Sequence, residues 1–374
     1  MANAFPAAPG WPLTGSMRAG DPQLSVVVPF HKNLVQLREC LGALAPVPEW
    51  AEVIVVADGA IDRCHGLAAE FGARVIEMAG PRGPGAARNR GTKGATGAII
   101  VFIDADVVAA PGVLAQMRDR LHERPELAAV FGAYDERPRE AAFISQYRNL
   151  SHSYFHQTSN AEARTFWAGL GAVRREAFDA VDGFDERFGR PSVEDIDFGY
   201  RLSGLGYKIL LDPTIRGCHL KRWTLKSAVV SDLRDRGIPW TQLMLKFARL
   251  DNDLNVQTNQ RIAVVLAYAL LPLLILATIA PLWSAAVGVV LLALLFLNRR
   301  YYAFFLRRRG LWFACRVFPM HLLHHLCNGL SFVLGSAIFY SGKLIGVTLP
   351  GAVPLGRWSS TKTAGPPVVD SSGL

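Results

Sequence analysis

At 374 residues, with 51% hydrophobic residues and a mean hydropathy of +0.20, the chain is long enough for one large domain and more apolar than most soluble proteins, so we expect a membrane-associated region. Its net charge of +9 is not gathered into one stripe, which favours anionic lipid or phosphate as a partner and argues against nucleic acid. The five cysteines are odd in number and contain no C-x-x-C pair, which argues against a disulfide framework or a zinc cage and fits a reducing cytoplasm.

Residues 1–22 are rich in Ala, Pro and Gly and lack the basic start and apolar core of a secretory signal, so we expect them to be disordered and the following domain to stay in the cytoplasm. From Leu24 to Asp104, short β-rich runs alternate with helix-like stretches. This alternation predicts an α/β fold with a Rossmann-like, mostly parallel sheet. The strands are LSVVVPF, VIVVA, RVIEM and AIIVFID, and helices are expected at 33–44, 62–71 and 84–95.

The clearest candidate site is Asp104-Ala105-Asp106, which follows the apolar run AIIVFI. Ligands of open α/β sheets bind at the carboxyl ends of the strands, so this run delivers two carboxylates to the binding edge. Such a pair suits Mg²⁺ or Mn²⁺, with substrate phosphates completing the coordination. Alternatively, the pair only caps the following turn, and a D-x-D pattern alone does not decide between the two roles.

Two further segments are expected near the same edge. Asp58 ends the run VIVVA and could accept hydrogen bonds from a base or ribose, or form a tight turn. The segment GPRGPGAARNRG at 80–91 places Arg82, Arg88 and Arg90 at the start of a helix, where they suit phosphate oxygens. It does not follow the first strand and has Arg88 in place of a third glycine, which weakens a dinucleotide-binding interpretation.

Two later motifs add candidate residues. The acidic run EDIDFGYR at 194–201 opens a predicted helix, in which a carboxylate could act as a general base, or could cap the helix while Asp197 pairs with Arg201. The run CHLKRW at 218–223 makes His219 a candidate metal ligand, a phosphate contact or a structural residue. The region 138–166 has poor periodicity and is expected to hold helix and loop that shape an acceptor site.

No charged residue occurs from Ile262 to Asn298, a stretch of 37 residues. One helix of that length would measure ~55 Å against a hydrocarbon core of ~30 Å, so we expect a hairpin at 262–298 that folds back at Pro281. Arg261 before it and an arginine cluster after it place both ends of the hairpin in the cytoplasm. A buried soluble helical bundle is the alternative.

Beyond Gly310 the sequence is apolar but carries three histidines before a second uncharged stretch. It predicts an interfacial amphipathic helix and then a shorter span or re-entrant segment at 311–347, within a membrane region at 261–348. His321, His324 and His325 share a helix face and could bind haem or a metal, or could be polar residues at a membrane interface. Residues 349–374, rich in Pro, Gly, Ser and Thr, are expected to form a disordered tail.

Together these motifs resemble those of family 2 glycosyltransferases with the nucleotide-sugar-binding A-type (GT-A) fold. The resemblance covers roughly residues 24–225, in the family's order and spacing, and implies a GT-A domain at 23–225. The mixture of apolar and basic residues that follows predicts an amphipathic interfacial linker at 226–260. The matching elements are VVVPF at 26–30, VVADGAID at 55–62, GPGAARNRG at 83–91, FIDAD at 102–106, WAGLGAVRREAF at 167–178, GFDE at 183–186 and EDIDFGYRL at 194–202.

The resemblance implies transfer of a sugar from a nucleoside-diphosphate sugar, with inversion, to a lipid-linked or other membrane-associated acceptor. Asp195 would be the general base on the acceptor hydroxyl, and Mg²⁺ or Mn²⁺ would stabilise the leaving diphosphate. The family's first loop usually has two adjacent aspartates, and Ala57 replaces the first, so the donor's base and sugar stay open. The implied site residues are Pro29, Asp58 and Arg88 at the nucleotide, Asp104 and Asp106 at the metal, and His219 at the metal or phosphate.

Other residues join this site by position. Ala105 lies between the two metal carboxylates, beside the expected nucleotide sugar. Gly169 and Gly171 would let donor or acceptor approach the backbone closely, or would only form a tight turn, and we group them with Glu194 and Trp240 as a donor or acceptor loop. The segment 224–250 could bring a lipid acceptor to the site. The whole is expected to be a multi-pass plasma-membrane protein with a cytoplasmic catalytic domain.

Three alternative functions match the sequence less well. Processive polysaccharide synthases share the domain but usually carry a Q-x-x-R-W element and more spans, whereas only the run RGIPW at 236–240 is loosely similar. A catalytically silent membrane scaffold would be favoured by loss of Asp104, Asp106 or Asp195, all of which are present. A nucleotidyltransferase or dinucleotide-binding enzyme would need a glycine-rich turn directly after the first strand, where this chain has PFH at 29–31.

Overall fold

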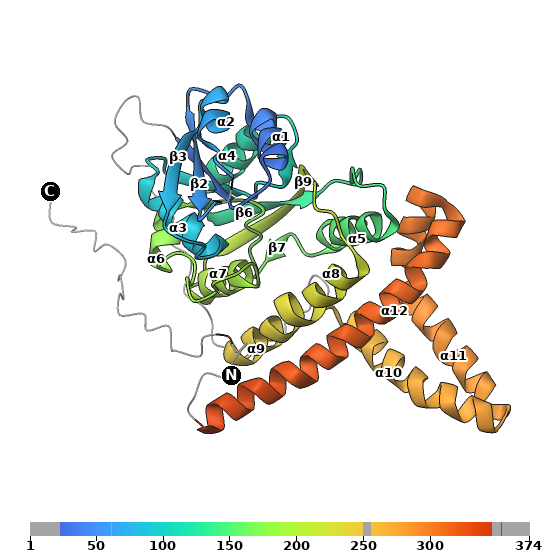
Figure 1. The fold of residues 1–374 in the computed structure, drawn as a ribbon. Helices are drawn as coiled ribbons and strands as arrows, with labels where there is room; N and C mark the ends of the chain where they lie inside the picture. Colours follow the sequence, from blue (N-terminus) through green and yellow to red (C-terminus); the bar gives the residue numbers. More distant parts are fainter. Residues whose placement is uncertain (1–22, 61, 250–255, 346–352, 354–374) are drawn as a thin grey trace, which may run out of the picture.

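The computed structural model describes residues 23–60, 62–249, 256–345 and 353. The segments expected to be disordered, 1–22 and 349–374, lie outside the described residues apart from Val353. The N-terminal part is an α/β domain built on one sheet, and the C-terminal part is a set of long helices that extends below and beside it (Figure 1).

The sheet has the strand order β3-β2-β1-β4-β8-β6-β9-β5, and β7 pairs with β9. Strands β1 to β4 are mutually parallel, β8 is antiparallel to both β4 and β6, and β6 is parallel to β9. The described strands are β1 (Leu24–Phe30), β2 (Ala51–Asp58), β3 (Arg74–Met78), β4 (Ile99–Ile103), β5 (Val107–Ala109), β6 (Leu127–Tyr134), β7 (Glu162–Ala163), β8 (Leu170–Arg174) and β9 (Lys208–His219).

The helices of the α/β domain cover both faces of this sheet, which explains why β1 and β4 are continuous buried apolar runs. Asn33 begins the first helix by accepting a hydrogen bond from the backbone N–H of Gln36, and Pro84 occupies the first turn of the third. The helices are α1 (Leu34–Leu44), α2 (His65–Glu70), α3 (Pro84–Gly94), α4 (Val113–Glu123), α5 (Phe143–Thr158), α6 (Arg175–Ala180) and α7 (Glu194–Gly204).

The predicted alternation of strands and helices is confirmed in chain order. After β1, β2 and β3 the chain returns to place β4 on the other side of β1, so a crevice forms at the carboxyl ends of β1 and β4. Helix α3 packs directly on the sheet beneath this crevice. A Cβ added to Gly91 would lie 2.3 Å from Val27 Cγ1 and 2.9 Å from Val56 Cγ2, so only glycine permits this close approach.

The C-terminal part begins directly after β9. The segment predicted as an interfacial linker contains three consecutive helical pieces, and the charge-free stretch forms the expected hairpin, with a turn at Ala280 and Pro281. The described elements are α8 (Leu225–Val230), the π-helical η1 (Ser231–Gly237), α9 (Ile238–Lys246), α10 (Thr258–Ile279), α11 (Leu282–Leu297) and α12 (Arg299–Ile345).

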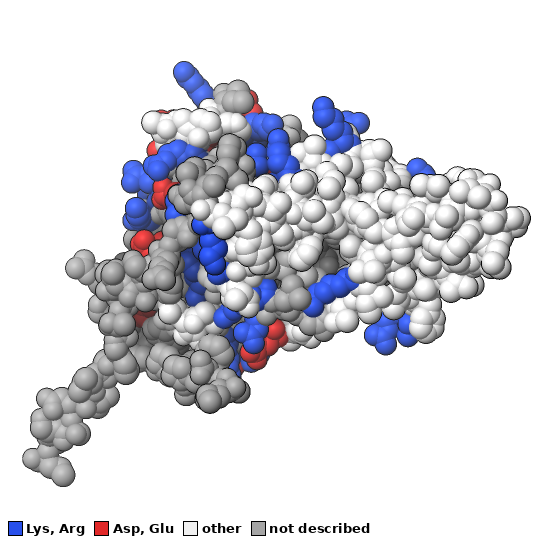
Figure 2. Space-filling model, turned by 90° about the horizontal axis from the view of Figure 1, so that it is seen from below, with Lys and Arg blue, Asp and Glu red and all other residues white. Residues whose placement is uncertain are grey.

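Helix α12 has one break, at Gly310, which adopts a φ of 81°. Beyond it, residues 311–345 form one continuous helix, where an interfacial helix followed by a separate span was expected. Among the described helices, α10 and α12 are long and apolar enough to cross a membrane, and α11 is apolar but shorter. Seen from below, the projection that holds the hairpin is almost free of charged side chains, and Lys and Arg gather around its margin (Figure 2).

Candidate active site

A cleft of about 520 Å³ lies at the carboxyl ends of β1, β2 and β4, within the size range of small-molecule sites. It brings together nine of the twelve residues proposed from the sequence, which come from strand ends, from α3 and from the start of α7. These nine are Pro29, Asp58, Arg88, Asp104, Ala105, Asp106, Glu194, Asp195 and His219.

Asp58, at the end of β2, holds the loop that precedes α3. Its two carboxylate oxygens accept the backbone N–H groups of Arg82 and Gly83, each at 2.8 Å. The backbone carbonyl of Asp58 lies 2.9 Å from Nδ1 of His31, at the end of β1. Asp58 therefore shapes the cleft through the glycine-rich loop, with both of its carboxylate oxygens engaged by the protein.

Arg88, on α3, connects the end of β4 to the start of α7. Its Nη2 donates to Oδ1 of Asp104 at 2.7 Å, and its Nη1 donates to Oε1 of Glu194 at 3.0 Å. Burial opposes the charge of Arg88, but Asp104, Glu194 and Asp195 raise its pKa above the ordinary value. Burial also raises the pKa of Asp104, and the adjacent guanidinium works against that rise. Both Nη atoms of Arg88 thus donate to carboxylates. To contact a substrate phosphate, as predicted, Arg88 would have to divide its hydrogen bonds between the phosphate and one of these carboxylates.

His219 and Asp106 form a second pair of charged or polar side chains in the cleft. Nε2 of His219, at the end of β9, lies 3.3 Å from Oδ2 of Asp106. Burial would raise the pKa of Asp106, but His219 and Lys221 hold it below its usual value. The imidazole stacks on Tyr134, with ring centroids 4.5 Å apart and an interplanar angle of 7°. Tyr134 therefore fixes the plane in which the His219 nitrogens point.

Residues 25–182 match the family model described as Glycosyl transferase family 2. They form a family 2 glycosyltransferase domain. The match covers the crevice, Asp58, Arg88 and both aspartates of the D-x-D pattern, whereas Asp195 and His219 lie beyond its end. The same sheet continues through these later residues, because β9 pairs with β6 and β5.

Two known proteins are similar to this glycosyltransferase domain. Validoxylamine A glucosyltransferase of Streptomyces hygroscopicus subsp. limoneus is 27% identical over 249 residues, which cover 57% of this chain and 54% of that protein. The chain therefore spans about half the length of this relative. The mannosyltransferase PcManGT from Pyrobaculum calidifontis, solved in complex with GDP-Man and Mn²⁺, aligns over 84% of this chain and 87% of that chain, with 18% identity and a TM-score of 0.51. This second likeness shows the fold.

The glycosyltransferase domain offers donor atoms that fit a divalent cation. Nδ1 of His219 lies 2.9 Å from Oδ1 of Asn149, and because an amide oxygen only accepts, Nδ1 carries the hydrogen. Nε2 faces Asp106 at 3.3 Å, and the hydrogen bond between them helps to lower the pKa of Asp106. A metal ion would take the place of the proton between them, because an imidazole nitrogen and a carboxylate oxygen are both ligands of Mn²⁺. Within the described residues, no group of three or more His, Cys, Asp or Glu side chains is arranged to hold a metal ion. Substrate oxygens would therefore complete the coordination.

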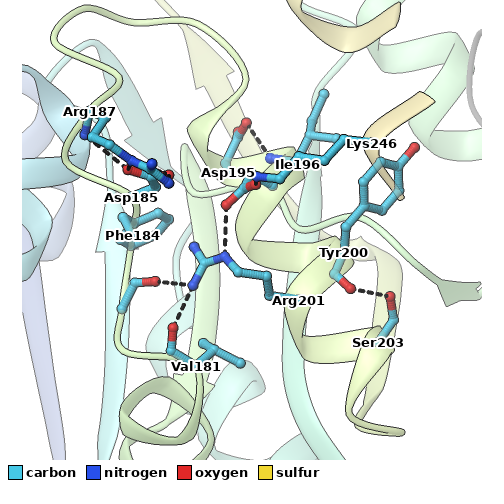
Figure 3. Close-up of polar contacts among 12 residues, drawn as sticks. Val181, Phe184, Asp185, Arg187, Asp195, Ile196, Tyr200, Arg201, Ser203 and Lys246 are labelled. Carbon is cyan, nitrogen blue, oxygen red and sulfur yellow. Dashed lines mark hydrogen bonds and ion pairs between the residues drawn. The ribbon is translucent and has the colours of Figure 1, made fainter. Parts of the chain in front are cut away.

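Asp195 lies in the first turn of α7, where the cleft meets a second, inner pocket of about 120 Å³. Burial and the neighbouring Glu194 raise its pKa to about 7, against the lowering effect of Arg236 and Arg88. Its carboxylate accepts the backbone N–H of Ile196 at 2.9 Å (Figure 3). A carboxyl group with this pKa is partly ionised at neutral pH, as a general base requires.

Asp197, the third acidic residue of this turn, has a structural role. Oδ2 of Asp197 accepts a 2.7 Å hydrogen bond from Nε of Arg201, and the same guanidinium donates to the carbonyls of Val181 and Gly183 (Figure 3). Lys246 of α9 also pairs with Asp197, at 3.3 Å. The ion pair considered in the sequence analysis therefore forms at Asp197, while Asp195 faces the cleft.

The inner pocket lies between the glycosyltransferase domain and α12. The predicted site residue Trp240 lines this pocket, and its Nε1 donates to the hydroxyl of Tyr200 at 3.2 Å. Arg236 lines both the cleft and the pocket, beside Asp195. The residues shared by the two spaces are Tyr134, His152, Trp167, Asp195 and Arg236.

Gly169 and Gly171 serve packing inside the domain. A Cβ on Gly169 would meet the ring of Trp167 at 2.7 Å, and one on Gly171 would meet the ring of Phe166 at 2.6 Å. The space beside each glycine is thus filled by an aromatic side chain of the same loop. The residue of this loop that lines the cleft is Trp167, whereas the backbone of the two glycines was expected to face the donor or acceptor.

Sequence reasoning missed the aromatic residues and Arg236 that line both the cleft and the inner pocket. Tyr134 ends β6, and His152 lies on α5, in a region whose helix was not assigned. The Tyr134 ring stacks with those of His152 and His219, and it meets Trp167 edge-on. A strand-end tyrosine and histidines at helical spacing, His152 and His156, were the available signals.

Proposed function

We propose that the chain is an inverting, metal-dependent glycosyltransferase that moves a sugar from a nucleoside-diphosphate sugar to a hydroxyl of a lipid-linked or other membrane-associated acceptor. The observation that carries the proposal is the position of Asp195. Its carboxylate, with a pKa of about 7, lies at the boundary between a nucleotide-sized cleft and a separate inner pocket. A base at this boundary can take the proton of an acceptor hydroxyl in the pocket while the donor lies in the cleft with its diphosphate on the far side of the anomeric carbon, as a single displacement requires.

In this proposal the acceptor hydroxyl approaches from the inner pocket and gives its proton to Asp195. The hydroxyl oxygen then bonds to the anomeric carbon while the bond from that carbon to the diphosphate oxygen breaks, so the configuration inverts. Asp106 and His219 would hold Mg²⁺ or Mn²⁺, which supplies positive charge to the leaving diphosphate. The neighbouring Lys221 adds a second cation to the same wall of the cleft.

Other residues would position the donor. Asp58 fixes the loop at 82–83, so that Gly83 and Pro84 at the start of α3 line the cleft, where the positive end of the helix dipole suits a diphosphate. Arg88 holds Asp104 and Glu194 in place and thereby sets the first turn of α7. The intact carboxylates Asp104, Asp106 and Asp195 disfavour a catalytically silent scaffold.

Two observations favour a membrane-associated acceptor. The exposed hairpin α10–α11 is charge-free from 262 to 298, and α12 lines the inner pocket with Tyr301, His324 and Asn328. The acceptor side of Asp195 is thus built partly from the helical region that we propose to contact lipid. A water-soluble acceptor would not need this arrangement.

The proposal is tested by incubating the full chain in detergent with a panel of nucleoside-diphosphate sugars, with Mn²⁺, with Mg²⁺ or with EDTA, and with or without membrane lipid extract. Released nucleoside diphosphate is measured for the wild type and for Asp106→Asn. We expect release from one donor, stimulated by lipid and lost with EDTA and in the variant. Absence of turnover and of donor binding across the panel would contradict the proposal.

A further inference from the structure

The long segment of α12 beyond Gly310 is packed on the helices that follow the glycosyltransferase domain. Nδ1 of His324 lies 2.9 Å from Oδ2 of Asp232 in η1, and the hydroxyl of Ser331 donates to the Asp232 carbonyl at 3.2 Å. Further along, a Cβ on Gly335 would lie 2.8 Å from Cβ of Thr241 in α9. Helices α9 and α12 run side by side in Figure 1. One face of α12 is therefore fixed to η1 and α9.

This packing restricts how α12 can meet a bilayer. If the segment crossed the hydrocarbon core, η1 and α9 beside it would have to enter the core too. These helices carry Arg234, Asp235 and Lys246, and the side chain of Arg234 is 61% exposed. A charged residue at the centre of a membrane carries a high free-energy cost of insertion. A crossing orientation is therefore strongly disfavoured, despite the length and hydropathy of the helix.

The opposite face of α12 is apolar and exposed. From 317 to 342 the helix has no Lys, Arg, Asp or Glu, and most of its exposed side chains are large and hydrophobic. A contiguous apolar face of this kind indicates contact with lipid or protein. The exposed large hydrophobic residues are Leu330 (43%), Phe332 (52%), Val333 (63%), Leu334 (40%) and Tyr340 (53%).

The surroundings identify lipid as the occupant of this face. The chain enters α12 directly from the hairpin, whose surface is also apolar and exposed, for example at Val265 (68%) and Ile275 (66%) (Figure 2). Just before the bend at Gly310, an arginine cluster lines a hollow of about 700 Å³ together with Asp135 and Glu136. Arg308 pairs with Glu136, and the remaining positive charge suits the phosphates of an anionic leaflet. The cluster consists of Arg137, Arg216, Arg307, Arg308 and Arg309.

We propose that residues 311–344 of α12 form an in-plane membrane anchor. The helix lies parallel to the bilayer with its apolar face at the boundary between headgroups and acyl chains, and the hairpin α10–α11 alone penetrates the hydrocarbon. The inner pocket, lined by His324 and Asn328 of the same helix, then lies at headgroup level. This refines the membrane attachment in the proposed function and does not depend on the sugar that is transferred.

The test is a depth profile along the helix. The full chain, with the exposed Cys315 replaced by serine, is reconstituted in phosphatidylcholine–phosphatidylglycerol vesicles. Single cysteines replace Trp312, Val333, Tyr340 or Leu344, and each carries a nitroxide whose depth is read from collision with oxygen and with a water-soluble nickel chelate. Labels at Val265 and Ile275 on the hairpin serve as the matched control, because ten residues of a crossing helix span ~15 Å of depth.

We expect all four α12 labels to lie at one shallow depth, ~5–10 Å below the headgroups, and the two hairpin labels to differ in depth. A depth that changes steadily by ~1.5 Å per residue along α12 would show a crossing helix and overturn the proposal. Labels inaccessible to both oxygen and the chelate would show that protein, such as a second copy of the chain, covers this face, and would also overturn it. Neither result bears on donor turnover, so the proposed function is tested separately.

Discussion

Nη2 of Arg88 donates a 2.7 Å hydrogen bond to Oδ1 of Asp104. Because Nη1 of the same buried side chain donates to Glu194, one guanidinium joins the strand end that carries the D-x-D pattern to the helix turn that carries Asp195. The two halves of the proposed reaction, departure of the diphosphate and deprotonation of the acceptor, are thus held in register by one residue of α3.

Arg88→Met should destabilise the α/β domain as well as reduce turnover. It leaves Asp104 and Glu194 without their buried partner, a loss that typically costs about 3–5 kcal/mol. Thermal unfolding of the full chain in detergent measures the effect. Arg90→Met, at an exposed position on the same helix, is the matched control and should leave the unfolding temperature nearly unchanged. Equal effects of the two substitutions would contradict the bridging role of Arg88.

Asp58→Asn should weaken donor binding more than it slows turnover. The amide keeps one acceptor oxygen but presents an NH₂ group to one of the two backbone donors, Arg82 or Gly83, and leaving a buried donor unpaired costs about 1–3 kcal/mol. We expect KM for the donor to rise about tenfold with a smaller change in kcat. Asp62→Asn, which alters only the exposed hydrogen bond from the Asn33 backbone, provides the comparison. An unchanged KM in Asp58→Asn would show that the loop does not depend on this carboxylate.

The rate should rise with pH through neutrality. Asp195 acts as a base only when ionised, and its pKa is raised to about 7, chiefly by burial. The logarithm of kcat/KM should therefore climb with a slope near one below this value and level off above it. In contrast, a profile that is already flat from pH 5.5 upward would mean that the base ionises at an ordinary carboxyl pKa or that another group performs the step.

Ionisation of Asp195 should lower the stability of the folded chain. Its pKa in the folded state lies above that of an unfolded aspartate, so between about pH 4 and 7 the folded state binds the extra proton and this group's contribution to stability falls as pH rises. Asp195→Asn removes the buried charge. At pH 8 the Asp195→Asn variant should therefore have a melting temperature about 2–4 °C above that of the wild type, which corresponds to a gain of about 1 kcal/mol in the free energy of unfolding. A lower melting temperature would mean that the ionised carboxylate is stabilised by its neighbours.

The sheet and half of the cleft could be predicted from the sequence because the signals are local. Runs such as VIVVA and AIIVFI are apolar on both faces, and each is followed by a carboxylate that lines the cleft, so Asp58, Asp104 and Asp106 were found from their position in the chain. The hairpin was found for a similar reason, since an uncharged stretch of that length leaves few alternatives. None of these inferences requires knowledge of a contact between distant residues.

The inner pocket could not be predicted in the same way. Helix α5 buries Ser145, Asn149, Ser151 and Ser153, so it shows no apolar periodicity, and its residues matter through contacts with α12 about 150 positions later, such as the 2.7 Å contact between Ser151 and Tyr301. The continuity of α12 was hidden because its histidines interrupt the hydrophobic pattern, although the structure buries them against the rest of the protein. Tertiary contacts here override the local signal.

The most direct test compares Asp195→Asn with Asp182→Asn, an identical chemical change at an exposed carboxylate outside the cleft. Once a donor is identified, release of nucleoside diphosphate and donor affinity are measured for both variants at pH 8 in the presence of Mn²⁺ and acceptor lipid. Removal of a general base predicts a loss of at least 100-fold in turnover for Asp195→Asn with unchanged donor affinity, and wild-type behaviour for Asp182→Asn. Turnover by Asp195→Asn within a few-fold of the wild type would contradict the account.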